Sequence, residues 1–192
     1  MGTHGEGEPR GDGLTVLVGE TEIAARVAEL AAAVERDHPP GEPLVIVAVM
    51  KGALVFLADL VRRLAMPLRI ELVNARSYRG ARREATVHIL DEVAALPLSG
   101  RHVLLLDCVL DSGSTLTALR REIAACGPAS LRTCVLLRKA VPREPDVQPE
   151  YVGMDIPDVF VVGYGLDHAN RWRHLPYVAA LGQDAIPEEQ ER

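Results

Sequence analysis

Residues 103–115 carry the side chains whose types and order have the clearest chemical meaning. An apolar stretch is followed by Asp107 and Asp111 and then by the small, hydroxylated turn Ser112-Gly113-Ser114-Thr115. Such a turn allows backbone N–H groups to face a ligand, with hydroxyls beside them, and the start of a following helix adds about half a positive charge. These residues predict a site for a phosphate monoester.

The two acids indicate what else the ligand carries. Sugar hydroxyls donate hydrogen bonds to carboxylates, and divalent cations bind to them, whereas a phosphate group alone gains nothing from them. The turn lacks the G-x-x-x-x-G-K and G-x-G-x-x-G spacings, so it is neither a Walker loop nor a dinucleotide-binding fingerprint. The plain alternative is that Asp107 only ends a strand and Asp111 only caps the next helix.

Lysine is rare in this chain, which has 19 arginines and two lysines, Lys51 and Lys139. A biased base composition also explains that count. By position, Lys51 and Gly52 follow the apolar run 44–50, and Lys139 follows the run 133–137. Both lysines therefore fall at expected strand ends, where an ammonium can donate to a ligand oxygen. A simple turn and a surface lysine beside an arginine are the alternatives.

Strands and helices are expected to alternate along the chain and to position these residues. Apolar residues recur at helical spacing over 21–34, 54–64 and 116–123. The expected strands are the continuous apolar runs 44–50 and 103–106 and the strand candidates 69–73, 133–137, 159–162 and 177–181, with a weak strand at 87–90 and a short helix at 91–95. The pattern predicts an α/β fold with a mainly parallel, twisted sheet flanked by helices, whose ligands bind at the carboxyl ends of the strands.

Length and composition narrow the class of protein. A chain of 192 residues, 48% hydrophobic and 25% charged, is one globular domain and not a disordered or collagen-like chain. The net charge of −6 argues against bulk affinity for nucleic acid or anionic membranes. No apolar run approaches about 18 residues, which predicts no membrane span. The three cysteines match no zinc pattern, which favours reduced thiols and a cytoplasmic location.

The string 103–115 resembles the phosphoribosyl-pyrophosphate motif of type I phosphoribosyltransferases. From about residue 16 to residue 181 the chain resembles one branch, the hypoxanthine-guanine phosphoribosyltransferases. Met50-Lys51-Gly52 resembles the strand-end Lys-Gly of that branch, which has a cis peptide facing pyrophosphate, and Ser77-Tyr78 resembles its mobile catalytic lid. Residues 160–167 resemble its purine-stacking segment, which ends in an aspartate linked to the metal.

The resemblance implies a cytoplasmic purine salvage enzyme of the type I phosphoribosyltransferase fold. Such an enzyme transfers the 5-phosphoribosyl group from phosphoribosyl pyrophosphate to hypoxanthine or guanine, with xanthine as a further candidate base, in the presence of Mg²⁺. The implied products are IMP or GMP and pyrophosphate, and the implied assembly is a homodimer or homotetramer. We expect residues 1–13 to be a disordered N-terminus, 14–182 the phosphoribosyltransferase domain with a small hood built from the chain ends, and 183–192 a polar tail.

The resemblance also implies a role for each candidate site residue, with Asp111 as the general base at the purine N7. The other implied roles are phosphoribosyl binding by Asp107, Cys108, Ser112, Gly113, Ser114 and Thr115, pyrophosphate binding by Lys51, Gly52 and Arg173, purine binding by Lys139, Phe160, Val161 and Asp167, metal binding by Asp107 and Asp167, and a lid at Ser77 and Tyr78.

Several of these assignments have an open alternative. Phe160 inside a valine-rich strand is also typical of core packing, and Asp167 could simply cap a turn. Arg173 could belong to a surface patch with Arg171. The arginines within 76–83 form either a lid that closes over pyrophosphate or a solvated basic loop.

The chain departs from the family pattern at two neighbouring positions. Cys108 replaces the second acid, and Asp107 stands where glutamate is usual. A neutral thiol cannot supply a charge-assisted bond worth about 1.5–3 kcal/mol. We expect weaker binding of phosphoribosyl pyrophosphate, not a lost reaction, and an inert thiol.

Two other functions are compatible with the same scaffold. One is an RNA-binding regulator of the pyrimidine-attenuation type, which would need a basic face that the net charge of −6 disfavours. The other is a weakly active, nucleotide-sensing paralogue, for which Cys108 is the one support.

Overall fold

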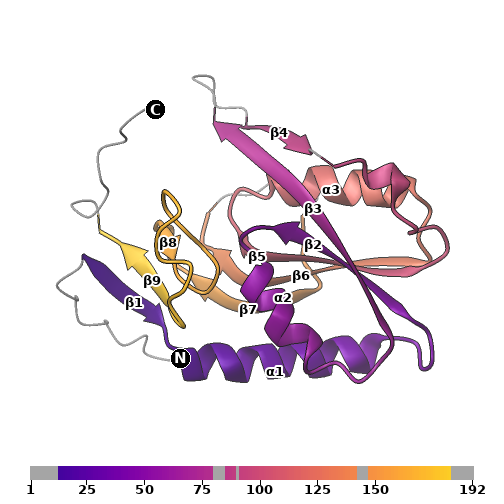
Figure 1. Ribbon diagram of the computed structural model, residues 1–192, viewed down its shortest axis with the longest axis horizontal. Coiled ribbons are helices and arrows are strands. Elements are labelled where there is room, and N and C mark those ends of the chain that lie inside the picture. The colour runs from indigo at the N-terminus through magenta and orange to yellow at the C-terminus, as the bar shows by residue number, and fades with distance from the viewer. Residues whose placement is uncertain (1–12, 80–84, 90, 142–146, 183–192) are drawn as a thin grey trace.

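The structure is a computed structural model that describes residues 13–79, 85–89, 91–141 and 147–182. The expected disordered terminus and polar tail lie outside these ranges, apart from Gly13. Figure 1 shows a central sheet with α1 and α2 on one face, α3 on the other, and a second small sheet at its side. None of the helices within the described ranges is both long enough and apolar enough to cross a membrane.

The central sheet has the strand order β4-β3-β2-β5-β6-β7 among the described residues. All neighbouring pairs are parallel except β3 with β4, which is antiparallel. This arrangement confirms the mainly parallel sheet that the sequence predicts. The strands are β2 (Leu44–Met50), β3 (Leu68–Arg79), β4 (Ala85–Ile89), β5 (His102–Leu110), β6 (Ser130–Lys139) and β7 (Tyr151–Ile156).

The inner strand β2 is apolar along its whole length because both faces of the sheet are covered there. In β2, Ile46 and Ala48 pack in the cluster shared with α1 (Glu20–Asp37) and α2 (Leu54–Val61). The alternate residues Val45 and Val47 pack in the cluster on the side of α3 (Ser114–Ala125) and the 3-10 helix η1 (Val93–Ala95). Neither face is left to solvent, so no polar alternation marks the strand.

A hood sheet forms from the two ends of the described chain, as expected. Its order is β1-β9-β8, with β1 (Leu14–Val18), β8 (Val161–Val162) and β9 (Val178–Leu181) paired antiparallel. A small separate core of Leu14, Val162, Ala179 and Leu181 stabilises it. Figure 1 shows the hood sheet beside the central sheet, next to α2.

Three details differ from the sequence prediction. The strand expected at 103–106 continues to Leu110, because residues 107–110 remain paired with β6 as far as Arg138. The polar loop expected at 76–86 is in part a ribbon, in which β3 runs on to Arg79 and pairs with β4. The strands β1 and β7 were not predicted, because short edge strands have mixed burial and no unbroken apolar run.

Candidate active site

A cleft of about 620 Å³ opens at the carboxyl ends of β2, β5 and β6 and is bordered by residues 160–173, which we call the hood segment. This is the edge at which ligands bind in open parallel sheets. Of the predicted site residues whose side chains are described, all but Cys108 line the cleft. They are Lys51, Gly52, Asp107, Asp111, Ser112, Gly113, Ser114, Thr115, Lys139, Phe160, Val161, Asp167 and Arg173.

The turn between β5 and α3 has the form expected of an anion cradle. Gly113 immediately precedes α3 and has a φ of 90°, a left-handed conformation that favours glycine. The hydroxyls of Ser112 and Ser114 lie 3.1 Å apart. The N-cap residue of α3 is Gly113, so Asp111 is not its N-cap and the plain alternative for that residue is wrong. The first N–H groups of α3 have no partner within the helix and can bind a ligand.

Asp111 and Lys139 are neighbours in the lining of the cleft. The Lys139 Nζ lies 3.0 Å from the Asp111 Oδ2 and 3.8 Å from an oxygen of Asp158. Lys139 is the last residue of β6 and is only 8% exposed, so it is not a surface lysine. A positive and a negative group thus lie side by side at one point of the wall.

Asp107 reaches the cleft from inside β5. Its Oδ1 accepts a hydrogen bond from the backbone N–H of Cys108 at 2.7 Å. Burial raises the pKa of Asp107 to about 7, although backbone N–H groups of Cys108 and Val109 act in the opposite direction. Ligand hydroxyls or a cation at this carboxyl group would favour its ionised form.

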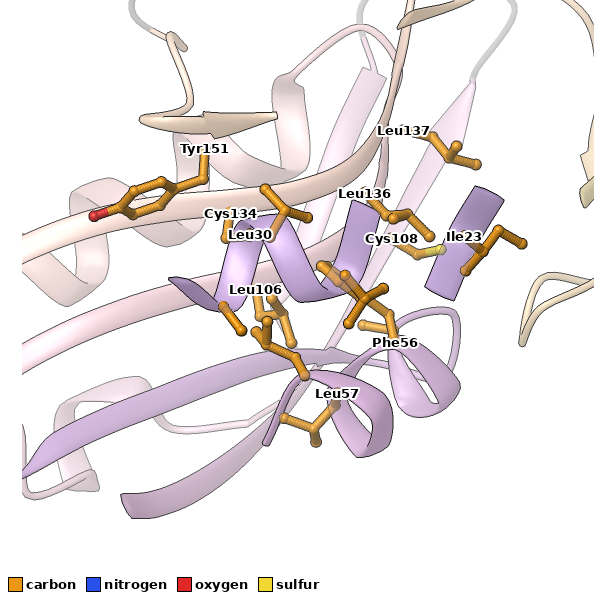
Figure 2. Packing of buried hydrophobic residues seen from close by; sticks show 14 of the residues in the cluster. Ile23, Leu30, Phe56, Leu57, Leu106, Cys108, Cys134, Leu136, Leu137 and Tyr151 are labelled. Carbon is orange, nitrogen blue, oxygen red and sulfur yellow. The ribbon is translucent and has the colours of Figure 1, made fainter. Parts of the chain in front are cut away.

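Cys108 does not lie in the cleft, which corrects its predicted place in the phosphoribosyl site. Successive side chains of a strand point to opposite faces, so Asp107 and Cys108 do not share a surface. The thiol is fully buried, and Figure 2 shows it in the core cluster with Phe56 and Leu136. Burial and the neighbouring Asp107 raise the pKa of the thiol, which keeps it neutral and inert.

Phe160 presents its ring to the cleft and is not a core residue. Its side chain is 47% exposed. The ring meets that of His168 edge to face, with 5.3 Å between centroids, and His168 stacks on Trp172. His168 thus contacts the rings of both Phe160 and Trp172.

Asp167 and Arg173 form a second ion pair in the cleft. Their closest oxygen and nitrogen are 2.6 Å apart. Asp167 also accepts the backbone N–H of Asn170, and Arg173 donates to the carbonyl of Gly165 at 2.7 Å. These contacts fix Arg173 inside the site, so it does not belong to a surface patch.

No described residues form a group of three or more acids, histidines or cysteines able to hold a metal ion unaided. Mg²⁺ is commonly held by one or two carboxylates together with substrate phosphates and water. Asp107 and Asp167 line the same cleft and fit that kind of ligand set.

The turn after β2 brings Lys51 to the cleft. The Met50–Lys51 peptide is cis, as the resemblance predicts. A Cβ added at Gly52 would lie 3.3 Å from the Cδ2 of Leu166, so this turn packs directly against the hood segment. Ser77 and Tyr78 lie in β3, opposite Val87 and Thr86 of β4, and their role as a lid stays a prediction.

Asn74 is a lining residue that the sequence did not single out. Its side-chain amide donates to Asp91 at 2.9 Å. Asn74 directly follows the strand expected at 69–73, at the same carboxyl edge as the other candidates. That position was the signal that could have revealed it.

Comparison with known proteins gives the class. The phosphoribosyl transferase domain family matches residues 18–169. The hypoxanthine phosphoribosyltransferase of Salmonella typhimurium is 42% identical over 168 residues, which cover 86% of this chain and 94% of that protein. The hypoxanthine-guanine phosphoribosyltransferase of Mycobacterium tuberculosis is 39% identical over 177 residues, 89% of this chain and 87% of that one.

A solved structure agrees with the sequence relatives. The hypoxanthine phosphoribosyltransferase of Staphylococcus aureus superimposes with a TM-score of 0.84 at 34% identity and covers 92% of this chain and 96% of that one. This chain therefore belongs to the phosphoribosyltransferase family and has the type I fold. Within that family it belongs to the hypoxanthine and hypoxanthine-guanine phosphoribosyltransferases.

Proposed function

We propose that this chain transfers the 5-phosphoribosyl group from phosphoribosyl pyrophosphate to hypoxanthine or guanine, releasing pyrophosphate and IMP or GMP. The observation that carries the proposal is the adjacency of Lys139 and Asp111, 3.0 Å apart in the cleft that also holds the hydroxylated turn. A 6-oxopurine presents its O6 and N7 side by side on one edge. Lys139 can donate to O6 while Asp111 accepts the proton carried by N7.

This pairing also predicts discrimination against adenine. Adenine places an amino donor where hypoxanthine and guanine place a carbonyl oxygen. The buried Lys139 ammonium would then face a second donor and lose its acceptor. Mismatches of this kind give discrimination of about 10⁴ or more in sites built around a hydrogen bond.

The remaining groups bind the two anionic parts of the substrate, the 5′-phosphate and the pyrophosphate. Ser112, Ser114 and Thr115, with the N–H groups at the start of α3, bind the 5′-phosphate. Lys51 and Arg173 bind pyrophosphate and stabilise the negative charge that grows on it as the glycosidic carbon gains oxocarbenium character. Phe160 stacks on the purine and helps to exclude water.

Asp107 and Asp167 would hold Mg²⁺ together with substrate oxygens. The cation supplies charge neutralisation for the departing pyrophosphate. Asp107 in addition accepts hydrogen bonds from the ribose hydroxyls, and Asp111 acts as the general base at N7.

One assay tests the proposal. The purified protein is incubated with Mg²⁺, phosphoribosyl pyrophosphate and each of hypoxanthine, guanine, xanthine, adenine and uracil, and the nucleotides are separated by chromatography. We expect IMP and GMP, with little product from adenine or uracil. Product from uracil alone, or from no base, would contradict the proposal.

The observations do not favour the two alternative functions. Cys108 was the support for a nucleotide-sensing paralogue, and it lies in the core and not in the cleft. The net charge of −6 disfavours an RNA-binding regulator. A salt-dependent gel shift with single-stranded RNA, in the absence of turnover, would support the RNA-binding regulator instead.

We further propose that residues 14–182 form a cytoplasmic enzyme domain that assembles as a homodimer or homotetramer. Three exposed apolar side chains support self-association: Leu54 of α2 and Ile70 and Leu72 of β3 are 51%, 44% and 47% exposed. Light scattering over a dilution series measures the assembly, and a monomer at all concentrations would contradict it.

A further inference from the structure

Tyr164 occupies an unusual position in the segment that follows β8. It has a φ of 50°, in the left-handed region that non-glycine residues rarely adopt, and it is only 4% exposed. Its backbone N–H donates to the carbonyl of Leu175 at 2.8 Å, and its hydroxyl donates to the Asp59 Oδ2 at 2.7 Å. A conformation of this cost persists only where surrounding contacts fix it, and here they include a hydrogen bond to α2.

The turn that contains Tyr164 lies directly on the turn that contains Lys51. A Cβ added at Gly165 would lie 2.8 Å from the carbonyl oxygen of Gly52 and 3.3 Å from a methyl group of Val55. On the other side, Leu166 approaches Gly52 closely. The two turns therefore pack closely against each other, with Gly165 on one turn and Gly52 on the other.

The same segment carries pyrophosphate-side groups. The backbone N–H of Gly165 donates to the carbonyl of Arg173, and the Arg173 guanidinium donates back to the carbonyl of Gly165. Arg173 in turn is paired with Asp167. A shift of the segment would therefore move Arg173 and Asp167 together relative to Lys51.

Asp59 anchors the segment to the helix that starts just after Lys51 and Gly52. It lies in α2 and also forms an ion pair with Arg62, so its carboxylate keeps a partner on the helix. Burial and the hydrogen bond to Asp59 raise the pKa of Tyr164, which keeps the phenol protonated as the donor.

We propose that Tyr164 is a positioning residue that, through Asp59, holds Arg173 and Asp167 in register with Lys51. This inference rests on the proposed phosphoribosyl transfer. On this proposal, the pyrophosphate site is formed jointly by the start of α2 and the hood segment. The Tyr164–Asp59 hydrogen bond, which lies outside the cleft, joins the two. Loss of that bond should weaken pyrophosphate binding while leaving the base-side pair Asp111 and Lys139 in place.

Tyr164→Phe tests the proposal because it removes one oxygen and keeps the ring. Tyr151→Phe is the matched control, because Tyr151 is also buried and its hydroxyl also donates to an aspartate, Asp37, at 3.2 Å. That pair lies at the other end of the sheet, in a small cavity lined by His38 and His102. Both variants should show a similar, small loss in melting temperature.

Kinetics should separate the two variants. For Tyr164→Phe we expect the KM for phosphoribosyl pyrophosphate to rise about 5- to 20-fold, with kcat and the KM for hypoxanthine changed less than about threefold. For Tyr151→Phe we expect all three to stay at the wild-type values. Equal KM values for phosphoribosyl pyrophosphate in both variants would overturn the inference.

Calorimetry of pyrophosphate binding with Mg²⁺ gives a readout that does not need turnover. Weaker binding by Tyr164→Phe than by the wild type supports the inference, and equal binding overturns it. Because this titration is independent of the base, an inactive wild-type protein would contradict the proposed function without deciding the role of Tyr164.

Asp59 variants complete the test. Asp59→Ala should reproduce the rise in KM, whereas Asp59→Asn keeps an acceptor oxygen and should stay near the wild type. The double variant Tyr164→Phe/Asp59→Ala should be no worse than either single variant, since both remove the same bond. Additive effects would overturn the inference.

Discussion

The turns after β2 and β5 lie at the same edge of the sheet, and each joins a parallel strand to a helix. The β2 turn offers a cation, Lys51, and a glycine that contacts the hood segment. The β5 turn offers a carboxylate, three hydroxyls and a left-handed glycine, Gly113. The two turns share the same strand-turn-helix arrangement, but their side chains differ. The side chains therefore determine which part of a ligand each turn can bind.

Glycine has a different purpose in the two turns. Gly113 is needed for its φ of 90°, and its nearest neighbour, Val147, is at an ordinary 3.5 Å from an added Cβ. Gly52 is not among the residues with positive φ, but it has Leu166 at 3.3 Å. One glycine therefore sets backbone conformation, and the other permits close approach.

The largest expected effect concerns the acid of the β5 turn. Asp111→Asn should lower kcat by about 10²- to 10⁴-fold while IMP binds nearly as tightly as before, because the amide cannot take the N7 proton. Steady-state kinetics and IMP titration measure the two. Asp158→Asn is the control, since it changes the other carboxylate near Lys139, 3.8 Å away, and should leave kcat within about twofold. Equal activity of Asp111→Asn and the wild type would refute the general-base role.

The second effect contrasts the two lysines. Lys139→Met should reduce the preference for hypoxanthine over adenine by about 100-fold or more, because it removes the donor to O6. Lys51→Met should raise the KM for phosphoribosyl pyrophosphate and leave the base preference unchanged. The ratio of the kcat/KM values for hypoxanthine and adenine measures the preference of each variant. A changed preference in Lys51→Met would contradict the assignment of base recognition to Lys139 alone.

The third effect compares the two glycines directly. Gly113→Ala should cost about 1–2 kcal/mol of folding free energy, because alanine is strained at positive φ. Gly52→Ala should cost less, since the Leu166 methyl group can move by a few tenths of an ångström. Thermal melts of both variants measure the difference. A larger loss in Gly52→Ala would show that the close approach, and not the backbone conformation, is the stronger constraint.

The smallest effect lies outside both turns. Phe160→Leu should raise the KM for hypoxanthine about fivefold, corresponding to roughly 1 kcal/mol of stacking, and leave the KM for phosphoribosyl pyrophosphate unchanged. Leu54→Ala, at an exposed apolar residue outside the cleft, is the control and should change neither KM value when light scattering shows the wild-type assembly. Parallel increases in both KM values for Phe160→Leu would indicate that the hood sheet itself had shifted.

The strands of the central sheet could be predicted where both of their faces are buried. β2 appears in the sequence as an unbroken apolar run because α1, α2 and α3 cover it from both sides. The ribbon of β3 and β4 extends beyond this double cover, so the polar end of β3 from Arg76 to Arg79 gave no strand pattern, and β4 was indicated only by the weak candidate at 87–90. β7 has only one strand neighbour, and its mixed burial hides it in the same way.

The site residues were predicted by type and order, but their contacts were not. A single sequence does not say which side of a strand faces the ligand, so Cys108 was placed beside Asp107 although the two point apart. The pairing of Asp167 with Arg173 depends on a segment whose residues Tyr164, Ala169, Asn170 and Trp172 adopt positive φ. No propensity rule predicts such a path from non-glycine residues.

The two ion pairs of the cleft have a consequence for which ions the free protein attracts. Asp111 already neutralises Lys139, and Asp167 already neutralises Arg173. A chloride or sodium ion could pair with only one member of a pair and would leave the other member without its partner. A molecule that carries complementary groups for both members replaces the ion pair with contacts to each of them. The cleft therefore favours ligands that carry both hydrogen-bond donors and acceptors over single ions.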